Sequence, residues 1–142
     1  MSQQNIYDND ELFNNFYDIR SSEIILAESE NYYIVGAYEQ ANLYRKSDDK
    51  YVCCVGHHYG DPLDALIDKN EKFCVVVGCG VIVFRLKEPF ESYVYDKECD
   101  QWYEFGRDPK NVDWIISVKQ ISDKEVELLD EAENSRVIKI KI

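Results

Sequence analysis

The sequence is short of the residues that build metal sites and disulfide frameworks. It contains only two histidines, the neighbours His57 and His58, and its five cysteines form no C-x-x-C motif. Successive residues of an extended strand point to opposite faces, so the two histidines are poorly placed to bind one metal ion together. The odd number of cysteines, and the location of Cys74 and Cys79 in an apolar run, favour free buried thiols over disulfides. We therefore expect no metal and no other cofactor.

Positively charged residues are also few. The chain has 16 Lys and Arg against 28 Asp and Glu, which gives a net charge of −12 at pH 7. A field of this sign repels nucleic acids and anionic membrane surfaces, and it attracts basic proteins. Acidic charge also serves solubility alone, so a basic partner is one of two interpretations. Nucleic acid and membrane are not expected as partners, and the sequence leaves the oligomeric state open.

No apolar stretch is long enough to cross a membrane as a helix. The longest, FCVVVGCGVIVF at residues 73–84, has 12 residues, whereas a spanning helix needs about 20. The N-terminal residues MSQQNIYDNDE contain no basic region followed by an apolar stretch, so we expect no signal peptide. A cytoplasmic location is the expectation that follows, and a reducing compartment agrees with free thiols.

The centre of this apolar run lacks the rest of a nucleotide-binding fingerprint. Gly78-Cys79-Gly80 supplies a G-x-G, but the dinucleotide motif also requires a third glycine that opens a helix. Here Gly80 is followed by VIVF, a sequence that favours a strand. The pattern therefore predicts two central strands that meet, or are kinked, at glycines able to adopt positive φ.

The remaining sequence predicts one α+β domain over residues 1–142. The apolar fraction of 45% and the aromatic fraction of 13% are sufficient for a single core. A short internal helix is expected after Pro62, with Asp61 as its N-cap. An N-terminal helix is predicted at residues 8–20, because its apolar residues recur on one face: Leu12, Phe13, Phe16 and Tyr17.

Short apolar or alternating stretches bounded by turn residues predict that most of this domain is antiparallel β-sheet. They lie at residues 23–28, 32–38, 43–45, 50–57, 73–77, 81–84, 90–95, 101–105, 113–119, 121–129 and 136–142. The stretch at 90–95 follows Pro89 and is expected to be an edge strand. Two segments resemble each other, YIVG ending at Gly36 and VVVG ending at Gly78, 42 residues apart. Two copies are too few for a propeller, so we interpret them as two similar hairpins.

Residues 88–104 combine acidic and aromatic side chains. They contain six acidic residues and one basic residue, Lys97. Acidic side chains steer a basic partner and aromatic side chains anchor it, although a stacked sugar or a solvated edge with core aromatics fits the same pattern. A second acidic cluster at residues 123–133 has few aromatics and is expected to be a solvated face. The candidate partner-binding residues are Glu91, Tyr93, Tyr95, Asp96, Glu98, Asp100, Trp102, Tyr103 and Glu104.

The sequence GHHYGD at residues 56–61 is the best candidate for chemistry. Two histidines and a carboxylate between glycines could bind a metal ion or transfer protons. A strand-to-helix loop with Asp61 as a cap explains the same residues without any chemistry. A small enzyme or ligand-binding domain that uses this loop is therefore the alternative function, and no residue is assigned as catalytic.

A small, acidic, tyrosine-rich chain without catalytic motifs resembles the immunity proteins of bacterial contact-dependent inhibition and polymorphic toxin systems. The resemblance is carried by YGDPLDALIDKNEKFCVVVGCGVIVF, PFESYVYDKECDQWYEFGRD and DWIISVKQI, at residues 59–84, 89–108 and 113–121. Such proteins bind one cognate toxin, often a basic nuclease, and cover its active site. The resemblance thus implies a cytoplasmic inhibitor that is not an enzyme and whose partner is a basic protein toxin. It carries over no catalytic residue.

Overall fold

The computed structural model describes residues 23–142, and this part of the chain is all-β, with strands β1 to β13 and no helix. The prediction of an α+β fold is therefore wrong. The internal helix expected after Pro62 is replaced by strand β5 (Asp64–Ile67), whose backbone pairs with a buried neighbouring strand. So short a segment gains little from forming a single helical turn, whereas it completes a sheet here. The helix predicted at residues 8–20 lies outside the described residues.

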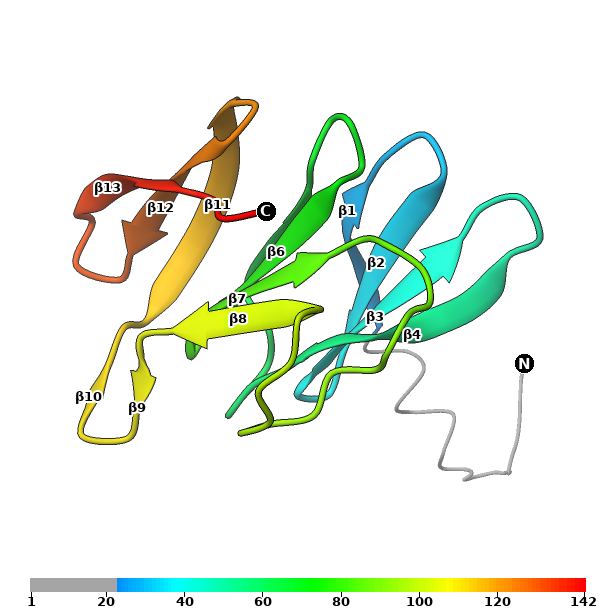
Figure 1. Cartoon of the computed structure of the whole chain (residues 1–142). Coiled ribbons are helices and arrows are strands. Elements are labelled where there is room, and N and C mark those ends of the chain that lie inside the picture. Colours follow the sequence, from blue (N-terminus) through cyan, green and yellow to red (C-terminus); the bar gives the residue numbers. More distant parts are fainter. Residues whose placement is uncertain (1–22) are drawn as a thin grey trace.

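The first sheet is an antiparallel meander in which each strand pairs with the next along the chain (Figure 1). Its order is β1-β2-β3-β4, and every predicted strand from 23 to 57 is confirmed in kind. The bounds are β1 Ile24–Glu28, β2 Tyr32–Ala37, β3 Gln40–Arg45 and β4 Lys50–His57.

The second sheet repeats this meander with strands β5-β6-β7-β8. The two central strands predicted around Gly78-Cys79-Gly80 are confirmed as β6 (Phe73–Gly78) and β7 (Gly80–Arg85). They form a hairpin in which Gly78 pairs with Gly80, and Gly80 has a φ of +84°. Strand β8 (Trp102–Phe105) pairs with β7 and closes the sheet.

The third sheet has three strands, in the order β11-β12-β13. They span Ile115–Ser122, Glu125–Asp130 and Ser135–Lys139. A small hairpin of β9 (Arg107–Asp108) and β10 (Asn111–Val112) connects the second sheet to the third, in a stretch that the sequence predicted only as a loop.

The second sheet lies between the other two and is buried on both faces (Figure 1). Alternate residues of β6 and β7 point in opposite directions, so Val76 and Phe84 join the core shared with the first sheet. Val75 and Val83 join the core shared with the third sheet. The unbroken apolar run at residues 73–84 is thus explained by a strand pair covered on both sides.

The similarity between the segments ending at Gly36 and Gly78 reflects this repetition. Each glycine lies near or at the end of the second strand of a four-stranded meander. The interpretation as two similar hairpins is correct for β2–β3 and β6–β7, but the repeated unit is the whole four-stranded meander. The flanking strands vary too much in sequence to show it.

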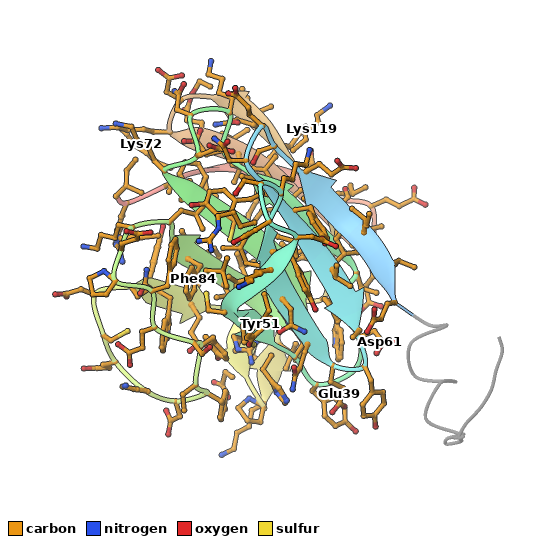
Figure 2. The ribbon with its side chains drawn as sticks, turned by 90° about the vertical axis from the view of Figure 1, so that its right-hand side faces the viewer. Glu39, Tyr51, Asp61, Lys72, Phe84 and Lys119 are labelled. Atoms are coloured by element: carbon orange, nitrogen blue, oxygen red, sulfur yellow. The ribbon has the colours of Figure 1, made fainter. Side chains whose placement is uncertain are left out.

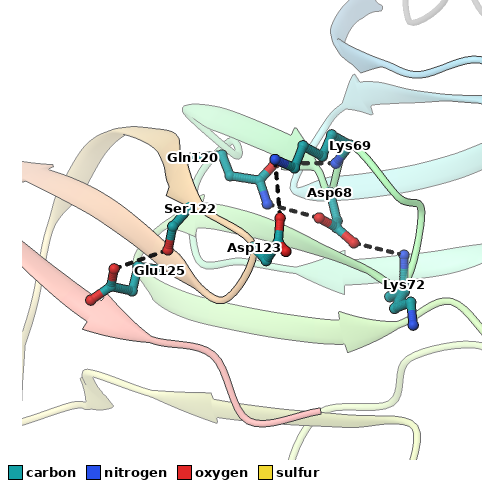
Figure 3. Close-up of polar contacts among 7 residues, drawn as sticks. All are labelled: Asp68, Lys69, Lys72, Gln120, Ser122, Asp123 and Glu125. Atoms are coloured by element: carbon teal, nitrogen blue, oxygen red, sulfur yellow. Dashed lines mark hydrogen bonds and ion pairs between the residues drawn. The ribbon is translucent and has the colours of Figure 1, made fainter.

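A polar network ties the β5–β6 loop to the third sheet (Figure 3). The buried carboxylate of Asp68 accepts hydrogen bonds from Lys72 N at 3.0 Å and Gln120 Nε2 at 2.7 Å. Gln120 Oε1 accepts from Lys69 N at 3.1 Å, and Lys69 forms an ion pair with Asp123 at 3.0 Å. Asp68 is therefore satisfied by structural partners, which explains how a carboxylate can be buried there.

Candidate functional site

A long irregular loop, residues 86–101, separates β7 from β8 and is held in place by buried side chains. The edge strand predicted at 90–95 is wrong, because these residues form no strand, although Tyr93 N donates to Cys54 O of β4 at 2.9 Å. The Tyr93 ring is buried 5.1 Å from the Trp102 ring, and its hydroxyl donates to Glu104 Oε1 at 2.6 Å. Burial, followed by this hydrogen bond, raises the pKa of Tyr93.

Gln101 and Trp102 fix the two ends of the loop. The buried Gln101 amide donates to the carbonyls of Arg85 and Lys87 at 2.7 and 3.0 Å. Its Oε1 accepts from Glu91 N at 2.7 Å. Trp102 stacks on a core phenylalanine, and its Nε1 donates to Lys97 O at 3.2 Å. The loop is therefore pinned at several points although it lacks regular structure.

The nine residues predicted to bind a partner divide into anchors and exposed groups. Tyr93 and Trp102 are core residues and cannot contact a partner directly. Glu91, Tyr103 and Glu104 are partly buried, and Glu91 forms an ion pair with Lys97. The exposed residues are Tyr95, Asp96, Glu98 and Asp100. We call these last four the acidic tip.

The acidic tip lines an open groove of about 720 Å³. Tyr103 and Arg107 form part of its wall. Tyr103 is itself fixed, since the Arg85 guanidinium lies 5.2 Å from its ring centre and its hydroxyl accepts from Lys141 N at 3.1 Å. The groove thus has a rigid wall and an acidic rim.

Arg107 separates this groove from a second hollow and is the most heavily bonded side chain of the region. Its Nη1 and Nη2 donate to Cys79 O and His57 O, both at 2.8 Å, and its Nε lies 2.7 Å from Glu104 Oε1. The guanidinium also lies 5.5 Å from the Tyr95 ring centre. These contacts join the end of β4, the β6–β7 turn and β8 to the β9–β10 hairpin. This role of Arg107 could not be predicted from the sequence, because the residue lies in a stretch rich in turn residues.

The second hollow is a cleft of about 640 Å³ at the histidine loop. Three exposed aromatic residues from separate segments surround it: Tyr59, Tyr95 and Trp114. We call it the aromatic cleft. Figure 2 shows Glu39 of the β2–β3 turn and Asp61 near each other at this end of the molecule. Asp61 is not a helix cap, because strand β5 and no helix follows it, and its Oδ1 accepts from Glu39 N at 3.1 Å.

The two histidines have opposite environments, as expected for neighbours on extended chain. His57 is exposed, whereas His58 is 1% exposed and neither of its ring nitrogens has a hydrogen-bond partner among residues 23–142. Burial, followed by the nearby charge of Arg107, lowers the pKa of His58 to about 3. The imidazole is therefore neutral at physiological pH, so His58 adds no charge to the lining of the cleft.

Among residues 23–142, no three His, Cys, Asp or Glu side chains gather closely enough to hold a metal ion. All five cysteines are free thiols. In the same residues there is no helix of the length and apolarity that crossing a bilayer requires.

Comparison with known proteins identifies no family. No protein-family model matches the chain, and neither does any curated protein. Among solved structures, Kluyveromyces lactis Hsv2 is similar over 76% of this chain and 42% of its own, with 8% sequence identity and a TM-score of 0.42. The chain thus spans less than half of the length of that structure, and a likeness of this size carries no functional inference.

Proposed function

We propose that this chain is a binding protein that docks onto a basic partner protein through the acidic tip of loop 86–101. The observation that carries the proposal is the combination of a long loop, buried anchors and an exposed acidic end. Loops of this length without secondary structure are uncommon in compact domains and usually serve a function. Here Asp96, Glu98 and Asp100 are exposed together.

The buried anchor residues preorganise loop 86–101 for binding. Tyr93, Gln101 and Trp102 already hold its backbone, so little conformational entropy remains to be lost on binding. The acidic charges repel one another in the isolated protein, and a positive partner surface relieves that repulsion and accelerates encounter.

The partner that fits the resemblance to immunity proteins is a basic toxin, with nuclease as the expected class. In that role the chain covers the active site of the toxin in the cytoplasm and performs no catalysis itself.

The alternative of acid–base catalysis at residues 56–61 is disfavoured, because His58 is enclosed and stays neutral far below physiological pH. A ligand-binding role for the same loop remains compatible with the aromatic cleft.

The test is a kinetic comparison of two charge-reversal variants. The first changes Asp96, Glu98 and Asp100 to Lys, and the matched control changes Glu125, Glu131 and Glu133, which are exposed on the third sheet and its turn, to Lys. Both alter the net charge equally. The binding partner in the assay is a basic nuclease toxin, the class of partner proposed above.

We expect the first variant to associate at least about tenfold more slowly by surface plasmon resonance, with a weaker salt dependence than the parent. The control should stay close to the parent. Equal effects of both variants would show that only net charge matters, and an effect confined to the control would move the interface to residues 123–133.

A further inference from the structure

The aromatic cleft exposes apolar surface in a concave shape, which is unusual for a surface without a partner. Trp114 is 37% exposed, Tyr95 is 56% exposed and Tyr59 is 78% exposed. They belong to the segment before β11, the loop 86–101 and the segment after β4. Aromatic residues around a preformed hollow are typical of the centre of a binding surface, where most binding energy concentrates.

The walls of the cleft are fixed by backbone contacts. Cys79 and Trp114 form an isolated antiparallel bridge, and Gly80 N donates to Asp113 O at 2.8 Å. Asp113 N donates in turn to Gly106 O at 2.9 Å. Arg107, which also lines the cleft, is held by its bonds to Cys79 O and His57 O. Backbone contacts therefore hold together the segments that line the aromatic cleft.

The charges around the cleft indicate what it accepts. His58 is neutral, and Arg107 and Lys110 are the cationic groups of the lining. A lysine or arginine side chain of a partner would meet these like charges there. Glu39, the acidic group of the lining, already accepts a hydrogen bond from Gly60 N at 3.2 Å. An uncharged aromatic ring is not repelled by Arg107 or Lys110, and it can stack on Tyr95 or Trp114.

We propose that the aromatic cleft receives an aromatic side chain of the same basic partner, as the anchor of the interface. The inference rests on the proposed function. It assigns partner binding to two adjoining surfaces, the acidic tip and the aromatic cleft. Tyr95 lines both the acidic groove and the cleft, so the two surfaces are continuous. The acidic tip receives the cationic side chains of the partner, and the cleft receives an uncharged ring.

The first experiment needs no partner. Indole is added to the ¹⁵N-labelled protein, and backbone amide shifts are followed; butylguanidinium is added in a parallel titration. We expect indole to shift the amides of Gly60, Val112 and Trp114, with a dissociation constant on the order of 1–10 mM for so small a ligand. Butylguanidinium should shift residues of the acidic tip instead. Indole shifts absent from the cleft, or butylguanidinium binding there, would overturn the inference.

The second experiment separates the cleft from the acidic tip. Trp114→Ala and Tyr59→Ala remove rim rings, and Tyr51→Ala, an exposed tyrosine on β4, is the control. With the basic partner, Trp114→Ala should raise the dissociation rate about tenfold or more while leaving the salt dependence of association unchanged. Tyr59→Ala should act in the same direction, and Tyr51→Ala should have no effect.

The outcomes distinguish the two proposals. If the acidic-tip reversal leaves association unchanged, the proposed function fails whatever indole does. If that reversal slows association but Trp114→Ala and Tyr59→Ala dissociate like the parent, the docking surface stands and the anchor inference is overturned.

Discussion

Buried His58 makes the protein sensitive to mild acid, and the size of this effect follows from the structure. The unfolded chain binds a proton at His58 with a pKa near 6.5, whereas the folded protein lowers that pKa to about 3. Because the folded pKa is depressed, protons bind the unfolded state more strongly. The contribution of His58 to stability is therefore full above pH 6.5 and is lost as the pH falls from there toward 3.

The expected loss between pH 7.5 and pH 5 is about 2 kcal/mol. At pH 5 the unfolded imidazole is roughly 97% protonated, and the folded one is still neutral, so the loss depends almost only on the unfolded pKa. About 2 kcal/mol is a large share of the roughly 5–15 kcal/mol that stabilises a typical domain. The pKa values of Asp48 and Glu71 are also lowered, but from 3.8 and 4.5, so their contributions are lost at lower pH.

The assay is urea unfolding at pH 7.5, 6.5, 5.8 and 5.0, followed by tryptophan fluorescence, for the parent and for His58→Leu. Leucine removes two ring nitrogens that have no hydrogen-bond partner among the described residues, so the variant should be within about 1 kcal/mol of the parent at pH 7.5. Between pH 7.5 and pH 5, the free energy of unfolding of the variant minus that of the parent should rise by about 2 kcal/mol. His57→Gln, at the exposed neighbour, should keep the acid sensitivity of the parent.

Parallel curves for the parent and His58→Leu would refute the reasoning, because they would mean that His58 gains a proton as easily in the folded state as in the unfolded one. The His58 ring proton shift in NMR provides an independent check. It should not titrate above pH 4 in the folded protein.

Two further predictions test the turns and the thiols. Gly80→Ala should destabilise the protein by more than about 2 kcal/mol in urea, because φ is +84° and a Cβ would lie 2.2 Å from Arg107 Cγ and 2.9 Å from two backbone oxygens. Gly60→Ala, with φ +81° but nothing within 4 Å, should cost only about 1 kcal/mol, and equal losses would contradict the packing argument. Burial raises the pKa of Cys53 to about 12 and also raises that of Cys74, so both should resist iodoacetamide at pH 8 in the native protein. Partly exposed Cys99 should react first by mass spectrometry, and all five thiols should react after denaturation.

The sequence was most informative where local pattern and tertiary structure agree. The strands at 50–57 and around Gly78 and Gly80 were predictable, because apolar runs bounded by turn residues leave few alternatives to a buried hairpin. The segment after Pro62 was predicted wrongly because only its local pattern was visible in the sequence. Its residues suit a helix, but β6 offers it a backbone ladder that no local pattern reveals.

The candidate site was only half predictable. The acidic tip could be found from charge and aromatic content, whereas the burial of Tyr93 and Trp102 could not, because core and interface favour the same aromatic residues. The sequence pointed to two separate parts of the aromatic cleft, the loop 56–61 and Tyr95, but not to the cleft as one site. Its three rings are far apart along the chain, and Arg107 joins their supporting segments through carbonyl groups that no side-chain pattern encodes.

The position of the site follows from the way the meanders are connected. Links within the first sheet are short turns, but β7 and β8 are joined by residues 86–101, and β8 and β11 by the hairpin β9–β10. These two long connections hold Tyr95 and Arg107, which are 5.5 Å apart, ring centre to guanidinium. The second sheet is covered on both faces, so the stability of the core does not depend on the exposed residues of these connections. The sequence of the connections can therefore vary without loss of the fold. The acidic tip and the aromatic cleft are adjacent because Tyr95 of loop 86–101 and Arg107 of the β9–β10 hairpin line both the groove and the cleft. Loss of the Arg107 side chain would remove its bonds to Cys79 O and His57 O at the cleft and its ion pair with Glu104 at the groove, so this one residue contributes to both halves of the proposed interface.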